Sequence, residues 1–120
     1  MYPPKETSVV AVAEDPFVRR YMRCLLERRG YQVIESDAGN VRRLLESGEV
    51  KIDLVISNTP SVFSPFARQL PLVYLSAAPD PDLVSGFSCQ RTLQKPFQPA
   101  EVLSAVQELL TPVQQAAAAL

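Results

Sequence analysis

Short apolar runs alternate with helix-like segments along most of the 120-residue chain. The runs are rich in valine, isoleucine and leucine, as strands buried between two layers of helices are. They lie at Ser8–Ala13, Tyr31–Glu35, Ile52–Ser57, Leu72–Leu75 and Thr92–Leu93. Strands that alternate with helices form a parallel sheet, because right-handed crossovers place the helices on its two faces. The pattern predicts an α/β fold, a three-layer α/β/α sandwich around a five-stranded parallel sheet.

One domain accounts for the length, and we place it at residues 8–111, between a lead of residues 1–7 and a tail or linker of residues 112–120. Its first helix is expected from Phe17 to Arg29, because Asp15 followed by Pro16 is a typical N-cap and first-turn pair. Apolar residues recur at helical spacing in this segment and are expected to face the sheet; they are Phe17, Val18, Tyr21, Cys24 and Leu25.

The other helical segments are shorter, and they are expected after Asp37 up to Gly48, over Phe63–Gln69, over Asp80–Gly86, and after Pro99 up to Leu110. Asp37 is a suitable N-cap and Gly48 a suitable C-terminal glycine. Prolines at positions 60, 65 and 71 leave room for only about two turns between them, so the third helix is shortened. The last helix has the clearest apolar periodicity.

Composition excludes several function classes. The net charge is −1, with acids and bases intermixed, so the domain has no bulk attraction to nucleic acid or to a membrane. No apolar run can span a bilayer and the N-terminus lacks a secretory pattern, which predicts a cytoplasmic protein. The chain has no histidine, and Cys24 and Cys89 lie far apart. A structural zinc site, a histidine base and a phosphohistidine are therefore excluded, and both thiols are expected to be reduced.

Polar side chains follow four of the predicted strands. They are Glu14 and Asp15 after the first, Asn58 after the third, Ser76 after the fourth and Lys95 after the fifth. The carboxyl ends of parallel strands meet at one edge of the sheet, where ligands bind in open α/β folds. Carboxylates suit a hard cation such as Mg²⁺, while serine and lysine suit the oxygens of a phosphoryl group. We therefore expect one crevice with the composition of a phosphoryl-handling site.

From about Val9 to Leu110 the chain resembles the receiver domains of two-component response regulators, which are CheY-like. The matching segments are VVAVAED, DLVISN, PLVYLSA and QKPF. The resemblance implies a flavodoxin-like sheet with strand order 2-1-3-4-5, and it implies that the chain is a signalling module and not an enzyme.

The resemblance also assigns positions to the polar residues. Glu14 and Asp15 correspond to the metal-binding pair, and Asn58 stands where the family has its phosphoacceptor aspartate. Switch or phosphate-contact positions are Ser76, Thr92 and Lys95, with a cis peptide usually found before Pro96.

Asn58 is the most important departure from the family. A neutral amide cannot serve as the nucleophile that forms an acyl phosphate. It also removes one negative charge from the metal site, so Mg²⁺ is expected to bind weakly. In addition, Thr92 stands where receivers commonly carry an aromatic residue. We therefore expect a pseudo-receiver that is not phosphorylated and that acts through protein–protein interaction.

Plainer roles exist for the same residues. Asp15 can act only as the N-cap before Pro16, Lys95 can simply neutralise Glu14 or Asp15, and Ser76 can bond nearby backbone groups. Asn58 is either a neutral placeholder or a mimic of one signalling state, and both interpretations stay open.

Two other functions are alternatives to an interaction module that is not phosphorylated. One is residual phosphate acceptance by Asp53 or Asp15, although Asp53 lies at the start of its strand, the wrong end. The other is a small-ligand sensor that uses the crevice.

The partner implied by the resemblance is a histidine kinase or an output protein. A homodimer through the last helix and strand is a further arrangement, with candidate residues Gln94, Gln98, Glu101 and Gln107. No nucleic acid or membrane partner is expected. The arginines of the first helix, with Arg42 and Arg43, are interpreted as a solvated face, not as a patch for an acidic partner, because Glu27 and Glu46 are interspersed.

Overall fold

The computed structural model of the chain describes residues 8–110, so the expected lead and tail lie outside the described residues. The elements follow in the order β1 (Val9–Ala13), α1 (Pro16–Glu27), β2 (Gln32–Glu35), α2 (Ala38–Ser47), β3 (Leu54–Ser57), η1 (Pro60–Phe66), β4 (Leu72–Ser76), η2 (Pro81–Val84), β5 (Gln90–Gln94) and α3 (Pro99–Leu109). The segments η1 and η2 are 3-10 helices. Among residues 8–110, no helix is both long and apolar enough to cross a membrane.

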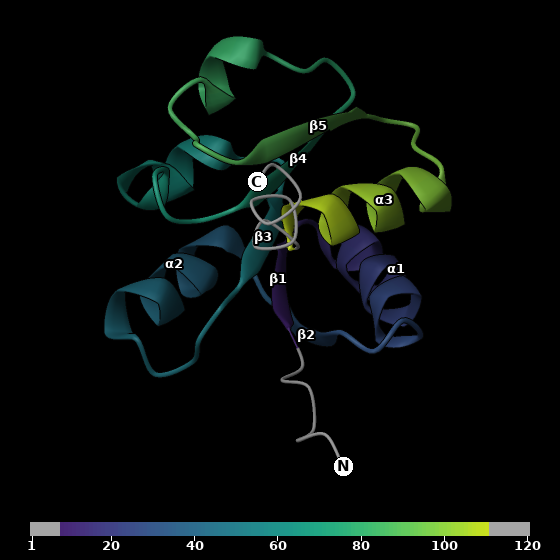
Figure 1. Ribbon diagram of the computed structural model, residues 1–120, viewed down its shortest axis with the longest axis horizontal. Coiled ribbons are helices and arrows are strands. Elements are labelled where there is room, and N and C mark those ends of the chain that lie inside the picture. Colours follow the sequence, from purple (N-terminus) through teal and green to yellow (C-terminus); the bar gives the residue numbers. More distant parts are fainter. Residues whose placement is uncertain (1–7, 111–120) are drawn as a thin grey trace, which may run out of the picture.

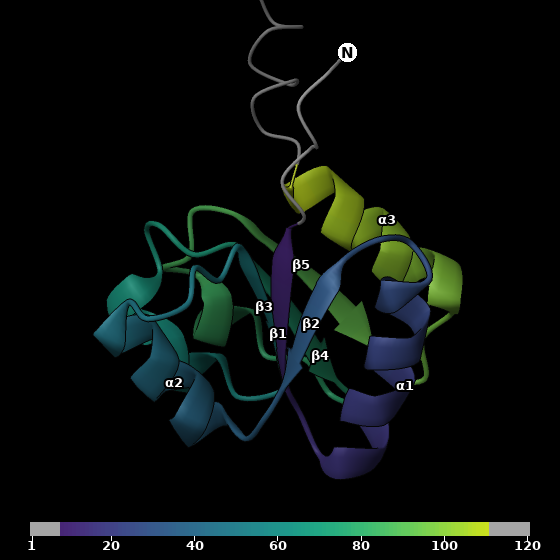
Figure 2. The ribbon, with the colours of Figure 1, turned by 90° about the horizontal axis from the view of Figure 1, so that it is seen from below.

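The five strands form one parallel sheet in the order β2-β1-β3-β4-β5. This confirms the expected fold class and strand order. Helices α1 and α3 cover one face of the sheet, while α2, η1 and η2 cover the other (Figures 1 and 2). Alternate residues of each strand point to opposite faces, so each central strand contributes to two apolar layers. In β1, for example, Val10 and Val12 face α1 and α3, whereas Ala11 and Ala13 face the other layer.

The expected sheet-facing side of α1 is only partly correct. Val18 and Leu25 pack against the core as expected, but the fully buried residues of the helix are Met22 and Leu26. Three of the residues expected to face the sheet are instead exposed; they are Phe17, Tyr21 and Cys24. Apolar residues form two neighbouring stripes along this helix, and periodicity alone cannot decide which of them meets the sheet. The buried stripe is the one that packs against β1 and α3.

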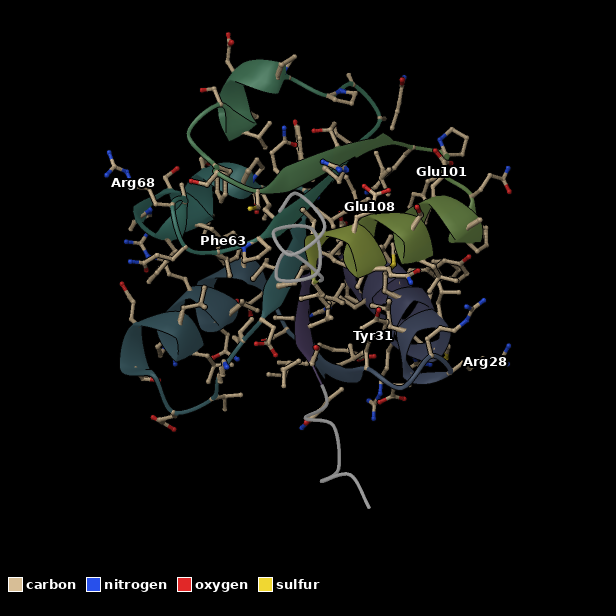
Figure 3. The ribbon with its side chains drawn as sticks, viewed as in Figure 1. Arg28, Tyr31, Phe63, Arg68, Glu101 and Glu108 are labelled. Atoms are coloured by element: carbon tan, nitrogen blue, oxygen red, sulfur yellow. The ribbon has the colours of Figure 1, made fainter. Side chains whose placement is uncertain are left out.

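The third helix is shortened, as expected, but it begins and ends earlier than predicted. It is a 3-10 helix over Pro60–Phe66, not a segment over Phe63–Gln69. Pro60 starts it, and Pro65 lies inside it without an N–H to donate, so a regular α-helix cannot continue through this segment. Phe63 anchors the segment, because its side chain is fully buried in the apolar layer that also contains Val41 of α2 (Figure 3).

The ends of α2 agree with the prediction. The Asp37 carboxylate accepts a hydrogen bond from the Asn40 amide at 2.8 Å, which satisfies one of the free N–H groups of the first turn. Gly48 follows the helix with φ of +69°, a left-handed conformation that L side chains rarely adopt.

Candidate functional site

Four strands deliver polar residues to the carboxyl edge of the sheet. The β1–β3 register pairs Ala13 with Ser57, so Glu14 and Asn58 come directly after two paired residues. The ends of β4 and β5 are joined, because the Lys95 amide donates to the Ser76 carbonyl at 2.8 Å. The sheet therefore gathers the predicted residues at one edge, as the alternating pattern requires.

Glu14 and Lys95 form the centre of this edge. The Lys95 ammonium lies 3.3 Å from the Glu14 carboxylate and donates a hydrogen bond to its Oε1 atom. The Glu14 side chain is 0% exposed, while that of Lys95 is 27% exposed. The peptide bond between Lys95 and Pro96 is cis, as expected. The ion pair therefore connects residues that are 81 positions apart in the chain.

Burial controls the charge of Glu14. Removal of the carboxylate from water raises the pKa of Glu14 above its ordinary value, although the charge and hydrogen bond of Lys95 act in the opposite direction. The Oε2 atom of this carboxylate is buried without a hydrogen-bond partner in the described part of the chain. One carboxylate oxygen at this edge is therefore left for a further donor or a cation.

Asp15 acts as the N-cap of α1. Its Oδ1 atom accepts hydrogen bonds from the amides of Phe17 and Val18, both at 3.1 Å. The plainer role that the sequence suggests for Asp15 is therefore present.

The fit of a divalent cation is limited. Within residues 8–110, no group of three or more histidine, cysteine, aspartate or glutamate side chains is placed to hold a metal ion. Glu14 already faces an ammonium, and one oxygen of Asp15 is bound to the start of α1. Mg²⁺ usually takes one or two carboxylates together with water and phosphate oxygens. These residues do not make a tight site for it.

Asn58 is presented by a small turn that follows β3. Ser57 is fully buried, and its hydroxyl accepts from the Thr59 amide at 2.9 Å and contacts the Thr59 hydroxyl at 3.2 Å. This bonding supports the turn and leaves Asn58 exposed at the strand end. The roles of Ser57 and Thr59 were missed from the sequence, although a serine two residues before a threonine at a strand end is a recognisable turn signal.

The two hydroxyl residues of the expected switch lie in different surroundings. Ser76 ends β4, and its Oγ atom accepts from the Ala78 amide at 3.1 Å. Thr92 lies in the middle of β5, is exposed, and donates its hydroxyl hydrogen to the Gln90 side chain. The carboxyl edge therefore holds Ser76 near Lys95, while the contacts of Thr92 are with its own strand.

Comparisons with known proteins agree with this geometry at the level of fold. No family model matches the chain, and no curated protein matches it. Solved structures do match. A response regulator from Thermotoga maritima is 21% identical with a TM-score of 0.73, covering 88% of this chain and 99% of that chain.

Two further matches lead to the same result. The signal receiver domain of an HD domain-containing protein from Pseudomonas fluorescens is 20% identical with a TM-score of 0.72, covering 100% of this chain and 98% of that one. The chemotaxis response regulator CheY4 of Vibrio cholerae is 21% identical with a TM-score of 0.69, covering 88% of this chain and 100% of that one. The chain has a receiver-domain fold.

Asp53 lies at the opposite end of this receiver fold from the carboxyl edge. Its Oδ2 atom accepts a hydrogen bond from the Val9 amide at 2.8 Å, and Lys51 lies 4.0 Å from its other oxygen. The carboxylate thus satisfies the first N–H group of β1. This structural role gives no support to Asp53 as a phosphate acceptor.

Proposed function

We propose that the chain is a receiver-like signalling module of a two-component, or phosphorelay, system that works without accepting phosphate. The observation that carries the proposal is Asn58, exposed after β3 beside the Glu14–Lys95 pair. An amide at this place cannot form an acyl phosphate. The domain is then an interaction module and not an enzyme.

The ion pair supports a phosphorylation-independent state. Lys95 follows β5 and Glu14 follows β1, and their contact ties the two strand ends together without a phosphoryl group. A phosphoryl group would have to draw Lys95 away from a buried carboxylate, which would be left without its counter-ion. We infer that the pocket holds one conformation, and that the partner binds this conformation.

The partner in this proposal is a signalling protein, either a histidine kinase or an output protein, and the location is the cytoplasm. A homodimer through α3 and β5 fits the same scheme, with Gln94, Gln98, Glu101 and Gln107 as its candidate residues. On this face the Arg91 guanidinium lies 2.6 Å from the Glu108 carboxylate, which joins β5 to α3. That guanidinium holds the pKa of Glu108 below its ordinary value. The arrangement makes β5 and α3 one surface.

An NMR titration with Mg²⁺ and beryllofluoride tests the proposal, because beryllofluoride binds an aspartate carboxylate as a phosphoryl mimic. We expect no shift of the amide resonances near Asn58 in the native protein beyond a weak response to Mg²⁺. The matched control is Asn58→Asp, which should gain Mg²⁺ affinity and respond to beryllofluoride. Equal responses from the two proteins would show that Asn58 is not the decisive residue.

A further inference from the structure

Asn58 is exposed directly after β3, and an exposed asparagine has a covalent route to a carboxylate. Asparagine is one of the chemically labile residues of proteins. In deamidation, the backbone nitrogen of Thr59 loses its proton and attacks the side-chain carbonyl carbon of Asn58. A new C–N bond closes a five-membered imide ring, and the side-chain nitrogen leaves as ammonia. Water then opens the ring, which leaves aspartate or isoaspartate at position 58.

The hydrogen bonds of the turn at residues 57–59 oppose the first step of this reaction. The Thr59 nitrogen must be free to attack, but its N–H group donates to the Ser57 hydroxyl at 2.9 Å. Ser57 is fully buried, and its hydroxyl also contacts the Thr59 hydroxyl at 3.2 Å. A bonded N–H group gives up its proton less readily and points at its acceptor. Attack on Asn58 therefore requires the loss of this hydrogen bond.

The backbone on both sides of the turn is also held in place. Ser57 is in register with Ala13 of β1 and with Tyr74 of β4, so the end of β3 is fixed from two sides (Figure 2). Pro60 is buried at the start of η1, and its ring excludes the helical conformation for Thr59. Thr59 is β-branched, so its side chain crowds its own backbone nitrogen. Closure of the imide ring needs a backbone rotation that these constraints resist.

The chain contains a second asparagine that serves as a comparison. Asn40 and Asn58 are the two asparagines of the sequence, and each is followed by a β-branched residue. The amide after Asn40, that of Val41, donates to the Asp37 carbonyl at 3.0 Å as part of a regular helix. The amide after Asn58 has a side-chain acceptor instead. Loss of the Ser57 hydroxyl should consequently release Asn58 and leave Asn40 unaffected.

We propose that the turn at residues 57–59 keeps position 58 an amide by blocking deamidation of Asn58. The proposal concerns covalent chemistry, and it stands whether or not the domain signals without phosphate. Only its consequence rests on the proposed function. Deamidation would place a carboxylate beside Glu14 and Lys95 and would turn a domain that cannot accept phosphate into one that can. The turn then preserves the signalling state of the protein over time.

The test is incubation of the folded chain at mildly alkaline pH, followed by peptide mapping with mass spectrometry. The map gives the fractions of Asn58 and of Asn40 that have become aspartate or isoaspartate. A synthetic peptide with the sequence of residues 54–63 supplies the rate without the fold. Ser57→Ala removes the acceptor, and Thr59→Gly removes the branched side chain. The matched variant is Thr59→Val, which keeps the branch and the backbone N–H group but loses the hydroxyl.

We expect deamidation of Asn58 in the native protein to be at least about tenfold slower than in the peptide. Ser57→Ala should accelerate it by about five- to tenfold, which corresponds to the loss of one hydrogen bond. Thr59→Gly should also accelerate it, whereas Thr59→Val should stay within about twofold of the native rate. The rate at Asn40 should be the same in all four proteins. Circular dichroism should show that each variant is folded.

Three results would overturn the proposal. They are equal rates in the native protein and the peptide, an unchanged rate at Asn58 in folded Ser57→Ala, and equal acceleration at Asn40, which would assign the effect to global unfolding. Acetyl phosphate added to the converted Ser57→Ala protein separates this proposal from the proposed function. Phosphate uptake by the aspartate form would support both. Protection of Asn58 without uptake after conversion would overturn only the role of Asn58 as the missing phosphate acceptor.

Discussion

Replacement of Lys95 by methionine would leave the Glu14 carboxylate buried without its cation. At 3.3 Å and an effective dielectric constant of about 20, the attraction between the two charges is about 5 kcal/mol. Loss of one partner of a buried pair usually costs about 3–5 kcal/mol. Lys95 is 27% exposed and part of its attraction is screened, so we expect Lys95→Met to lower the free energy of unfolding by about 3 kcal/mol near neutral pH.

Glu14→Gln should cost less, about 1 kcal/mol, because the side chain of Lys95 is 27% exposed whereas that of Glu14 is fully buried. The double variant should be more stable than Lys95→Met alone, since it contains no uncompensated buried charge.

The pH dependence follows from the pKa of Glu14. Burial raises this pKa above its ordinary value in the folded state, so the native protein binds the proton more tightly than the unfolded chain does. The contribution of Glu14 to stability is therefore greatest at low pH and decreases as the pH rises from the ordinary value of 4.5 through the raised pKa. Lys95 matters only when Glu14 is ionised. The loss of unfolding free energy caused by Lys95→Met, relative to the native protein, should consequently be largest above the raised pKa of Glu14. This loss should decrease as the pH falls below that pKa.

Urea unfolding measures these differences in the free energy of unfolding. It is best followed by far-ultraviolet circular dichroism, because the chain has four tyrosines but no tryptophan whose fluorescence could report unfolding. The reasoning is refuted if Glu14→Gln costs as much as Lys95→Met, or if the stability lost through Lys95→Met is the same at about pH 8 as at about pH 4, which lies below the ordinary pKa of 4.5.

Three further substitutions test individual contacts by the same unfolding measurement. Asp15→Ala removes the N-cap bonds to Phe17 and Val18 and should cost about 1 kcal/mol; no loss would mean that the cap is not formed in solution. Gly48→Ala should cost about 1 kcal/mol because φ is +69° there, and a neutral result would argue against the left-handed turn. Asp53→Ala should cost about 1–2 kcal/mol by leaving the Val9 amide unpaired, and a loss of stability near zero would contradict that bond.

The sheet could be predicted from the sequence because buried parallel strands leave a strong signal. The run Ile52–Ser57 predicted β3, and the residues after each strand predicted which side chains would meet at the carboxyl edge. The contact of Glu14 with Lys95 is the clearest case, since it joins residues that are 81 positions apart in the chain. The strand order itself came from the resemblance and not from the periodicity.

The helices were harder to predict, and the reason is physical. In α1, apolar side chains cover two stripes, and only the position of the sheet selects Met22 over Tyr21 as the buried residue. In η1, the prolines at positions 60 and 65 indicate a disrupted helix but do not indicate which hydrogen bonds remain. At the site, the turn made by Ser57 and Thr59 depends on side-chain bonds that periodicity does not report.

The most direct test of the central claim is the intact mass of the protein after incubation with acetyl phosphate and Mg²⁺. The native chain, with Asn58 at the end of β3, should keep its mass. Asn58→Asp should gain the mass of one phosphoryl group, and hydroxylamine, which cleaves acyl phosphates, should remove it. An equal, hydroxylamine-sensitive gain by the native chain would contradict the account, because it would place a working phosphate acceptor at another residue.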